Sequence, residues 1–438
     1  MKFYNRESEL EILKKADSLK YKRSILSIIV GRRRVGKTTL ALKVKEDSLY
    51  FFVSKKSEAL LCEEFCEELQ KNGFKIYGKF EKFGELFEYI VDLSKTKPIT
   101  LIIDEFQNFY KINPSIFSSL QKIWDLNKNT AHLHLIICGS VYSLMKKIFE
   151  DSKEPLFGRA DFKIKLKELN VKVLKQILED YNAFNSKNLL DLYTITGGLA
   201  KYIELLVLYE AFDLKSMIEK IISPYSLFLD EGKNRLIEEF GKDYSVYFSI
   251  LSLIASSKTS RSEIESVLQK NISGYLERLE KDYNIIKPVK PINAKPNSKL
   301  QKYEIIDNFL NFWFRFIYKY QSLIEAENFE ALKEIIIRDF STYQGKFLEK
   351  LFVDILKLQQ KWTKIGRYWE RGNKNEIDIV AIDEKNKKIL FAEVKFNKKR
   401  ANLNELILKS RKLTEQYNAF KTDYKILSVE DVGEMLKR

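Results

Sequence analysis

The stretch Ser24-Ile-Leu-Ser-Ile-Ile-Val30 runs directly into Gly31-Arg-Arg-Arg-Val-Gly36-Lys37-Thr38-Thr39, and this junction decides the fold of the first half of the chain. An apolar run, a loop bounded by glycines and a helix-like segment follow one another, as the phosphate-binding pattern G-x4-G-K-[ST] requires. The glycines let backbone N–H groups turn toward phosphate, the lysine reaches the outer phosphates, and the threonine supplies a hydroxyl to Mg²⁺. A basic turn that matches the pattern by chance is the alternative.

The residues expected to hold the nucleotide form one continuous loop: Gly31, Arg32, Arg33, Arg34, Val35, Gly36, Lys37, Thr38 and Thr39. Up to about residue 210, apolar runs alternate with helix-like segments, which predicts an α/β fold with a parallel sheet and helices on both faces. The expected strands are Ile25–Val30, Leu49–Val53, Thr100–Ile103 and Leu133–Cys138.

Polar side chains follow two of these strands. At the carboxyl end of a parallel strand, Asp104 would hold Mg²⁺ through water and Glu105 would polarise the attacking water. Ser140 would sense the γ-phosphate if its strand adjoins the Asp104 strand, and it could also cap the next helix. Arg159, on a later loop, is expected either to stabilise the transition state, in cis or across a contact between identical subunits, or to form a surface salt bridge.

As an ordered set these residues resemble the archaeal P-loop ATPase family, which is related to the AAA-like and STAND-like ATPases. Arg6-Glu7, Leu156-Phe-Gly-Arg159 and Thr196-Gly-Gly198 add to the resemblance. It implies ATP in preference to GTP, Mg²⁺ as the cofactor, and a helical lid after the core. The chain departs from the family where Ala200 stands in the place of a usual proline, which leaves Lys201 as the candidate nucleotide-sensing residue.

Length and composition restrict the class of protein. The 438 residues are enough for about three domains, and no apolar run reaches the roughly 18 residues of a membrane span. The first residues lack the apolar core of a signal peptide, so a cytoplasmic protein without a membrane partner is expected. Three cysteines and two histidines exclude a disulfide framework and speak strongly against a zinc site or a histidine-based triad.

The excess of basic residues predicts a polyanionic partner. Lys and Arg total 76 against 61 Asp and Glu, a formal net charge of +15, and positive potential attracts phosphate backbones. DNA is therefore the expected macromolecular partner, although abundant Lys and Glu are also typical of a solvated, ion-paired surface.

The middle of the chain has the element order of a winged helix-turn-helix. Helices are expected at Tyr244–Ser256, Arg261–Leu268 and Ile272–Asp282, followed by a strand at Ile285–Val289. Basic residues of the third helix and wing would contact phosphate or form a solvated face, and they are Lys270, Arg278, Lys281, Lys287, Lys290, Lys295 and Lys299. The aromatic stretch Tyr303–Tyr320 is expected to be a buried connecting helix.

A second set of charged residues lies near the end of the sequence. Two apolar strands are joined by a polar turn at Asp383–Lys387, and period-two alternation puts Glu393 and Lys395 on one face. Asp378, across the hairpin, would complete a metal-binding pair with Glu393, and Lys395 would orient a water or stabilise phosphate charge. An edge hairpin with a Glu-Lys ion pair is the alternative.

This spacing resembles the PD-(D/E)xK nuclease superfamily, with Asp378 and Glu393-Val-Lys395 as the matching residues and Ile377 in the place of the proline. The resemblance implies an α/β restriction-endonuclease-like domain and an upstream acid, for which Glu349 is the candidate metal ligand. The expected regions are a P-loop core (1–165), a helical lid (166–235), a winged helix (236–320) and a nuclease-like domain (321–438). A DNA-processing or defence ATPase with a metal-dependent nuclease is the preferred function, and an ATP-driven switch with a non-cleaving module is the alternative.

Overall fold

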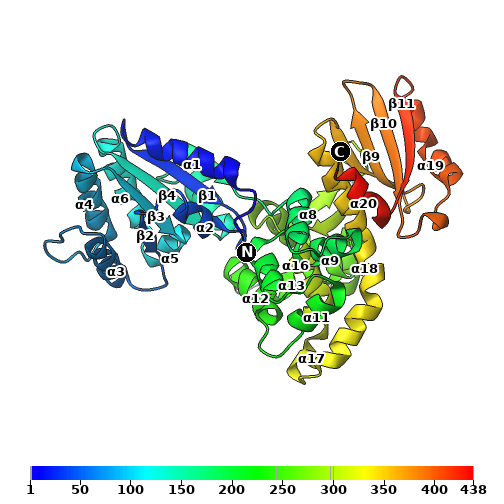
Figure 1. Cartoon of the computed structure of the whole chain (residues 1–438), viewed down its shortest axis with the longest axis horizontal. Coiled ribbons are helices and arrows are strands. Elements are labelled where there is room, and N and C mark those ends of the chain that lie inside the picture. Colours follow the sequence, from blue (N-terminus) through cyan, green and yellow to red (C-terminus); the bar gives the residue numbers. More distant parts are fainter. Residues whose placement is uncertain (1, 242–243, 296, 299, 438) are drawn as a thin grey trace. The chain divides into compact units, whose positions relative to one another are not determined.

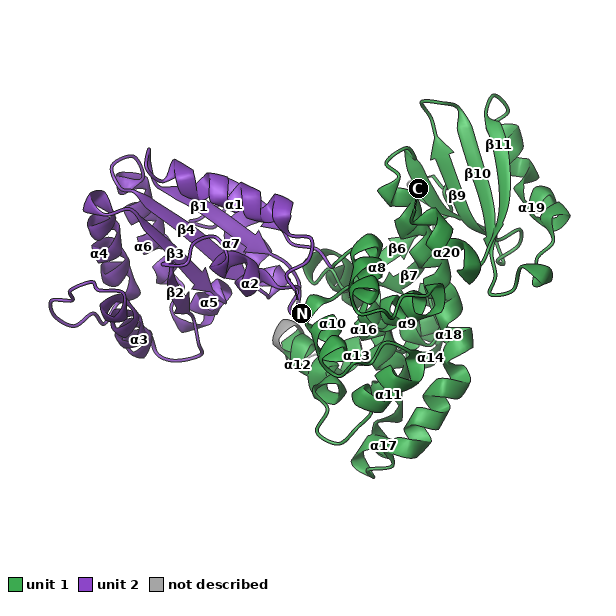
Figure 2. Ribbon diagram, in the orientation of Figure 1, with its two compact units in different colours: residues 1, 169–438 green, residues 2–168 purple. Residues whose placement is uncertain are grey.

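The computed structural model describes residues 2–241, 244–295, 297–298 and 300–437. Lys299, one of the basic residues assigned to the wing, lies outside these ranges. The chain folds into two compact units, the first comprising residues 2–168 and the second beginning at Leu169 (Figure 2). The three regions expected after residue 165 fall together in the second unit, apart from residues 166–168, and their status as separate domains stays a prediction.

The first unit is a five-stranded parallel sheet with helices on both faces (Figure 1). The strands stand in the order β2-β3-β4-β1-β5 and are β1 (Ile25–Val30), β2 (Leu49–Phe52), β3 (Ile99–Asp104), β4 (Leu133–Gly139) and β5 (Phe162–Lys165). The helices are α1 (Glu7–Leu19), α2 (Lys37–Leu42), α3 (Glu58–Lys71), α4 (Phe83–Thr96), α5 (Phe109–Ile112), α6 (Ser115–Asn127) and α7 (Tyr142–Glu150). The parallel α/β sheet expected from the sequence is confirmed.

The central strands are apolar runs because both of their faces are covered. Every residue of β1, β3 and β4 is buried, as expected for a parallel sheet between two layers of helices. Strand β5 was not predicted, since its sequence Phe-Lys-Ile-Lys alternates and only Ile164 is buried. Strand β5 lies at the edge of the sheet beside β1, where one side meets solvent.

A buried polar network ties helix α1 to the amino ends of the central strands. The ring of His134 hydrogen-bonds Ser27 Oγ through Nε2 at 2.9 Å and Asp17 Oδ1 through Nδ1 at 3.0 Å. Lys20 donates to Asp17 at 2.9 Å and to Thr100 Oγ1 at 2.5 Å. Ser27, His134 and Lys20 are 0% exposed, so no substrate reaches the serine and the network is structural.

The second unit begins with a helical region. Its helices are α8 (Val171–Asp180), α9 (Ser186–Thr196), α10 (Ala200–Leu208), α11 (Leu214–Ile221), α12 (Leu227–Phe240), α13 (Tyr244–Ala255), α14 (Arg261–Leu268), α15 (Ser273–Glu277), α16 (Asn308–Phe312), α17 (Gln321–Glu325) and α18 (Phe329–Leu358). Among the described helices, none is long and apolar enough to cross a membrane.

Helices α13, α14 and α15 are followed by an antiparallel pair of strands, β6 (Ile286–Val289) and β7 (Lys302–Ile305). The expectation that Tyr303–Tyr320 is one continuous helix is wrong at its start. Tyr303 pairs with Pro288 in the β6–β7 ladder, and its N–H donates to Thr259 O at 2.7 Å. Asp307 then caps α16 by accepting from the Leu310 N–H at 3.1 Å, and the aromatic residues after it are mostly buried as expected.

The chain ends in a four-stranded sheet with the order β11-β10-β9-β8. Its elements are β8 (Lys364–Tyr368), β9 (Ile377–Asp383), β10 (Lys388–Val394), α19 (Leu403–Gln416), β11 (Lys421–Leu427) and α20 (Val429–Met435). The expected hairpin is β9–β10, and its register pairs Ala392 with Ile379. The next positions along the two strands, Glu393 and Asp378, therefore face each other across the ladder.

Candidate functional site

The carboxyl ends of β1, β3 and β4 meet at one edge of the first sheet. Strand β4 pairs with both neighbours in parallel register, Val30 opposite Gly139 and Ile103 opposite Ile137. The loop after Val30, the residues after Ile103 and Ser140 consequently share this edge. The condition set for Ser140, that its strand adjoins the Asp104 strand, is met.

The phosphate loop has the backbone that its glycines were expected to provide. Gly36 has φ 97° and Arg34 has φ 74°, both in the left-handed region. A Cβ atom on Gly31 would lie 2.6 Å from the Leu166 carbonyl oxygen, so only glycine fits beside the end of β5. Helix α2 then begins at Lys37.

Lys37 is held inside this loop. Its Nζ donates to the carbonyl oxygens of Gly31 at 3.0 Å and Arg32 at 3.1 Å, and the residue is 6% exposed. Burial lowers the pKa of Lys37, although the nearby charges of Glu105 and Asp104 act in the opposite direction. An anion bound in the loop would therefore favour the charged ammonium group.

Asp104 is fixed by three donors. Its Oδ2 accepts from Thr38 Oγ1 at 2.5 Å and from the Tyr50 hydroxyl at 3.2 Å, while Oδ1 accepts from the Glu105 N–H at 2.8 Å. Burial, followed by the charge of Asp104, raises the pKa of Tyr50. Tyr50 was missed in the sequence because an aromatic residue in a strand indicates core packing by default.

Glu105 and Ser140 are brought together. Ser140 Oγ donates to Glu105 Oε2 at 2.7 Å, and the Gln107 side-chain amide donates to the same oxygen. Glu105 has φ 53°, a left-handed conformation that directs the chain away from the end of β3. The residue capping α7 is Val141, so the side chain of Ser140 serves Glu105 and not the helix. Gln107 gave no signal in the sequence.

Arg6 connects the loop to its surroundings. Its guanidinium donates to Val35 O at 3.3 Å and to Lys167 O at 2.6 Å, and the residue is 5% exposed. Arg32 lies 3.7 Å from Glu168. Arg6 thus holds the backbone of the loop, and Arg32 pairs with a residue beside it. Arg33 lies exposed.

Arg159 lies at the amino ends of the strands, opposite the phosphate loop. Two residues further on, the Asp161 N–H donates to Leu26 O at 2.8 Å, near the amino end of β1, and β1 spans roughly 16 Å before the loop begins. The guanidinium pairs with Asp125 at 2.7 Å and donates to the Pro155 carbonyl at 2.5 Å. The salt bridge is the arrangement observed, this placement argues against a role in cis, and a catalytic role for Arg159 stays a prediction.

The charged residues of the terminal hairpin also meet. Lys395 Nζ lies 2.8 Å from Glu393 Oε1 and 3.9 Å from Asp378 Oδ2, and Lys409 Nζ lies 3.7 Å from Glu393 Oε1. Asp378 Oδ2 accepts from the Val394 N–H at 2.8 Å. Burial lowers the pKa of Lys395, but the hydrogen bond to Glu393 and the neighbouring carboxylates outweigh it and leave the pKa raised.

One oxygen of this cluster lacks a partner. Glu393 Oε2 is buried and forms no hydrogen bond within the described part of the chain. Burial raises the pKa of Asp378, and the adjacent Glu393 adds to the effect. Two neighbouring carboxylates, one of which has an oxygen without a partner, suit a hard cation that keeps several waters, so these residues fit Mg²⁺.

Glu349 does not join them as predicted. Its Oε2 lies 2.7 Å from Arg367 Nη2. Across the residues that the structure describes, no three His, Cys, Asp or Glu side chains are close enough to hold one metal ion. Burial raises the pKa of Glu349 to about 7, and the charge of Asp378 contributes, so the two carboxyl groups are electrostatic neighbours.

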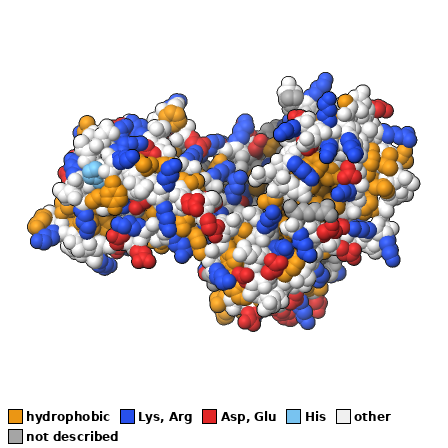
Figure 3. Space-filling model, turned by 45° about the horizontal axis from the view of Figure 1, so that its top comes forward, with side chains coloured by type: hydrophobic (Ala, Val, Ile, Leu, Met, Phe, Trp, Pro, Cys, Tyr) orange, Lys and Arg blue, Asp and Glu red, His pale blue; other side chains and the backbone are white. Residues whose placement is uncertain are grey.

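Two of the basic residues of the middle region form ion pairs. Lys281 lies 2.7 Å from Glu277 and Lys287 lies 3.3 Å from Glu304. On the face drawn in Figure 3, basic side chains are spread over both units and interleaved with acidic ones. Lys201, the candidate nucleotide-sensing residue, lies in the second unit and pairs with Glu204 at 2.9 Å. Some of the basic side chains thus form ion pairs on the surface.

Comparison with known families divides the chain into two matched segments. Residues 3–206 match a family described as an ATPase domain predominantly from Archaea. Residues 313–407 match a family of archaeal and bacterial proteins of unknown function. An uncharacterised protein of Methanocaldococcus jannaschii is 31% identical over 441 residues, which cover 98% of this chain and 93% of the relative.

Two solved structures share the fold over about three quarters of the chain. The Walker-type ATPase PABY2304 of Pyrococcus abyssi has a TM-score of 0.52 at 19% identity, covering 72% of this chain and 96% of its own. The ORC2 protein of Aeropyrum pernix, solved as ADPNP-ADP complexes, has a TM-score of 0.50 at 15% identity, covering 74% of this chain and 95% of its own.

Proposed function

The chain belongs to the archaeal P-loop ATPase family, and from this premise we propose that it binds and hydrolyses ATP with Mg²⁺ at the edge formed by Lys37, Asp104 and Ser140. The observation that carries the proposal is the hydrogen bond of 2.5 Å between Thr38 and Asp104, because it gathers two oxygen donors suited to Mg²⁺ beside the phosphate loop. When bound, Mg²⁺ neutralises charge on the phosphates.

Each residue of the edge has a separate part in the proposed reaction. The loop N–H groups and Lys37 hold the phosphates. Thr38 and Asp104 hold the metal, and Glu105 accepts a proton from the attacking water. Ser140 and Gln107 position the carboxylate of Glu105 through their hydrogen bonds. Nucleotide complexes of the similarly folded Aeropyrum protein support nucleotide binding.

Phosphate release from Mg²⁺-ATP by the purified full chain tests the proposal. We expect hydrolysis of ATP in preference to GTP, loss of hydrolysis in Asp104→Asn, and wild-type activity in the control Asp92→Asn, a carboxylate exposed on α4. Hydrolysis that survives Asp104→Asn would place the active site elsewhere.

We further propose that the terminal hairpin is a metal-dependent, PD-(D/E)xK-like nuclease site acting on DNA. The approach of Asp378, Glu393 and Lys395 to within 3.9 Å supports it, as does the orphaned oxygen of Glu393. In this proposal Asp378 and Glu393 hold the metal together with water, and Lys395 stabilises phosphate charge. Because Glu349 is paired with Arg367, it acts outside the metal's immediate ligands.

Linear, nicked and branched DNA incubated with the protein and Mg²⁺ or Mn²⁺ tests the nuclease. We expect cleavage that Asp378→Ala and Lys395→Ala abolish and that Lys425→Ala, an exposed lysine on β11, leaves unchanged. The rival proposal is an ATP-driven switch whose terminal module binds without cutting. Intact DNA with every substrate and metal, together with retained DNA binding, would favour that rival.

DNA and a second copy of the chain are the macromolecular partners that we propose. The order of α13, α14, α15, β6 and β7 supports a winged-helix module that contacts DNA backbones. A role of Arg159 across a contact between identical chains, in a homo-oligomer, would require its pair with Asp125 to open. Nucleotide state would then bias the arrangement of the units and thereby license the nuclease.

A further inference from the structure

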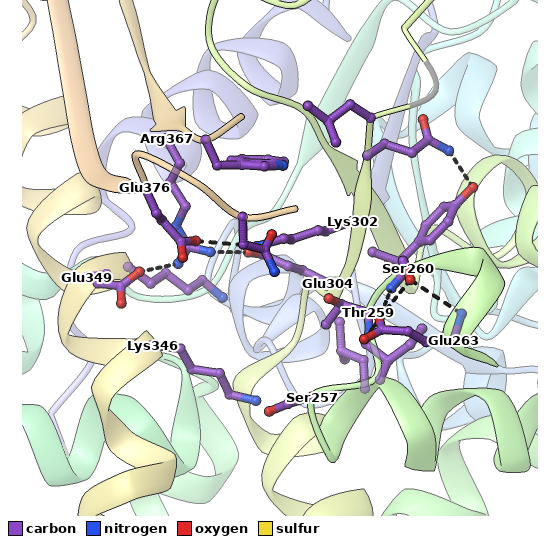
Figure 4. Close-up of a pocket in the computed structure, with 18 of the residues that line it drawn as sticks. Ser257, Thr259, Ser260, Glu263, Lys302, Glu304, Lys346, Glu349, Arg367 and Glu376 are labelled. Atoms are coloured by element: carbon purple, nitrogen blue, oxygen red, sulfur yellow. Dashed lines mark hydrogen bonds and ion pairs between the residues drawn. The ribbon is translucent and has the colours of Figure 1, made fainter. Parts of the chain in front are cut away.

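The second unit contains a pocket of about 680 Å³. Residues of α13, α14, β7, α18, β8 and the segment between β8 and β9 line it (Figure 4). Four carboxylates and four cationic side chains face the pocket. The way in which these charges pair decides what the pocket can bind.

The four carboxylates are already engaged. Arg367 pairs with Glu304 at 2.8 Å and with Glu349 at 2.7 Å. Lys302 pairs with Glu376 at 3.3 Å. Glu263 belongs to the capping box of α14 and accepts from the Ser260 N–H at 2.9 Å. Each of these carboxylates therefore has a direct partner other than the two remaining cations.

The two remaining cations are Lys346 and Lys350, one turn apart on α18. Lys346 Nζ donates to the side chain of Asn311 at 3.0 Å, and Lys350 Nζ donates to the carbonyl of Ile306 at 2.8 Å and to the side chain of Asn308 at 2.5 Å. Among the described residues, no carboxylate lies within 4.0 Å of either ammonium group. Burial lowers the pKa of both lysines to about 8.

Two partly buried ammonium groups with no carboxylate in direct contact indicate a site for an anion, because a buried charge is stable only when it is paired. Figure 4 shows Lys346 extending into the pocket toward Ser257, near Thr259 and Ser260. A phosphate monoester carries a charge of about −1.5 to −2 at pH 7 and three acceptor oxygens. It would balance both lysines and accept from the hydroxyl groups.

The pocket adjoins the terminal hairpin, since Glu376, which lines it, lies two residues before Asp378. Glu349 lines the pocket, and the charge of Asp378 contributes to its raised pKa. A nucleotide whose phosphate lies beside Lys346 and Lys350 would thus have the rest of its strand near Asp378 and Lys395. This neighbourhood favours a nucleic-acid end over an unrelated anion.

We propose that the pocket binds a phosphate monoester, namely the terminal phosphate of a nucleic-acid strand, through Lys346 and Lys350. The choice of a strand end rests on the proposed nuclease function, whereas the phosphate site itself stands on the charge pairing in the pocket. A free mononucleotide has the same chemistry, and the test separates the two sources.

Fluorescence anisotropy of the full chain with labelled ten-residue thymidine strands tests the proposal. One set of strands ends in a 5′- or 3′-phosphate and the other in hydroxyl groups, with saturating ADP to occupy the phosphate loop and EDTA to prevent cleavage. We expect phosphate-ended strands to bind at least tenfold more tightly. In the Lys346→Gln/Lys350→Gln variant the two sets should bind equally.

Lys357→Gln is the matched control, because Lys357 lies exposed on the same helix and pairs with Asp354. It should keep the preference for phosphate ends. Asp378→Asn should also keep it while losing any cleavage, so failure of the nuclease and failure of the pocket are distinguishable. Equal binding of phosphate and hydroxyl ends by the wild type, together with no binding of thymidine monophosphate, would overturn the proposal.

A change of pH tests the proposal on the wild-type protein, so the result does not depend on whether the variants fold. Raising the pH from 7 to 9.5 should weaken the preference as the two lysines lose their protons, and an unchanged preference would contradict the proposal. The charged groups that act on Lys346 and Lys350 are Glu304, Arg315, Arg367, Lys287, Asp307 and Asp354. Thymidine monophosphate that binds as tightly as the strand would support the phosphate site and identify a free nucleotide as its ligand.

Discussion

Thr38 donates a hydrogen bond of 2.5 Å to Oδ2 of Asp104, which joins the phosphate loop to the end of β3 although β4 lies between the two strands. The oxygen donors that Mg²⁺ requires are therefore positioned by two separate strands of one rigid sheet. Tyr50, from the edge strand β2, supports the same carboxylate oxygen at 3.2 Å. The geometry of this edge leads to the first two predictions.

Replacing Lys37 should abolish hydrolysis without unfolding the protein. Its Nζ is the side-chain cation inside the loop, and loss of one preorganised charge donor reduces turnover by about 10²–10³-fold. Phosphate release and thermal melting of Lys37→Ala check this. Lys43→Ala, an exposed lysine just after α2, is the control and should hydrolyse ATP normally. Turnover that persists in Lys37→Ala would refute the site.

Glu105→Gln should bind ATP and fail to hydrolyse it, because the amide cannot accept the proton of the attacking water. Ser140→Ala should cause a smaller loss, about tenfold, since one of the two donors that orient Glu105 remains. Binding of a fluorescent ATP analogue and phosphate release separate the two effects. Wild-type turnover in Glu105→Gln would exclude it as the base.

The motifs of this edge could be predicted because each is a short run that follows an apolar strand. The order of the strands could not, since long-range packing of helices on the sheet decides which parallel strands become neighbours. Tyr50 was missed for the same reason, since it lies 54 positions before Asp104. Gln107 lies two residues after Glu105 but belongs to no motif that assigns it a role.

The aromatic segment shows how tertiary contacts override a local pattern. Tyr303 and Ile305 have helical spacing with the residues that follow, yet both join the ladder with β6. The hairpin cluster was foreseen from the alternation of Glu393 and Lys395, whereas the pairing of Glu349 with Arg367 depends on α18 and β8 coming together. No sequence pattern specifies that contact.

Arg159→Ala should lower stability and leave hydrolysis by dilute protein unchanged. The half-exposed pair with Asp125 contributes about 1 kcal/mol or less, with a further contribution from the carbonyl contacts. Thermal melting and phosphate release over a range of protein concentrations check this. If the residue acts across a subunit contact, hydrolysis per chain should rise with concentration in the wild type and not in the variant. Loss of hydrolysis at every concentration, in folded protein, would restore a role in cis.

The stability of the first unit should fall as the pH drops below about 6.5. Burial lowers the pKa of His134 despite its hydrogen bond to Asp17, and the unfolded chain has the ordinary value of about 6.5. The unfolded state then binds more protons, so the free energy of unfolding decreases as acid is added. Pulse proteolysis in urea at pH 7.5 and 5.5, read on peptides from residues 2–168, measures it. His134→Gln should flatten this dependence, and an unchanged slope would contradict the assignment.

Manganese binding should reveal two separate sites. With ADP present, we expect two Mn²⁺ ions per chain, one held by Thr38 and Asp104 and one by Asp378 and Glu393, because each pair offers oxygen donors to a hard cation. Electron paramagnetic resonance measures the free Mn²⁺ during a titration, and the difference from the total gives the number of ions bound per chain. Asp378→Asn should retain one ion, Asp104→Asn should retain the other, and Asp383→Asn, at the far end of β9, should retain both. Two ions in Asp378→Asn would show that the hairpin holds no metal, and its carboxylates would then serve only the ion pair with Lys395.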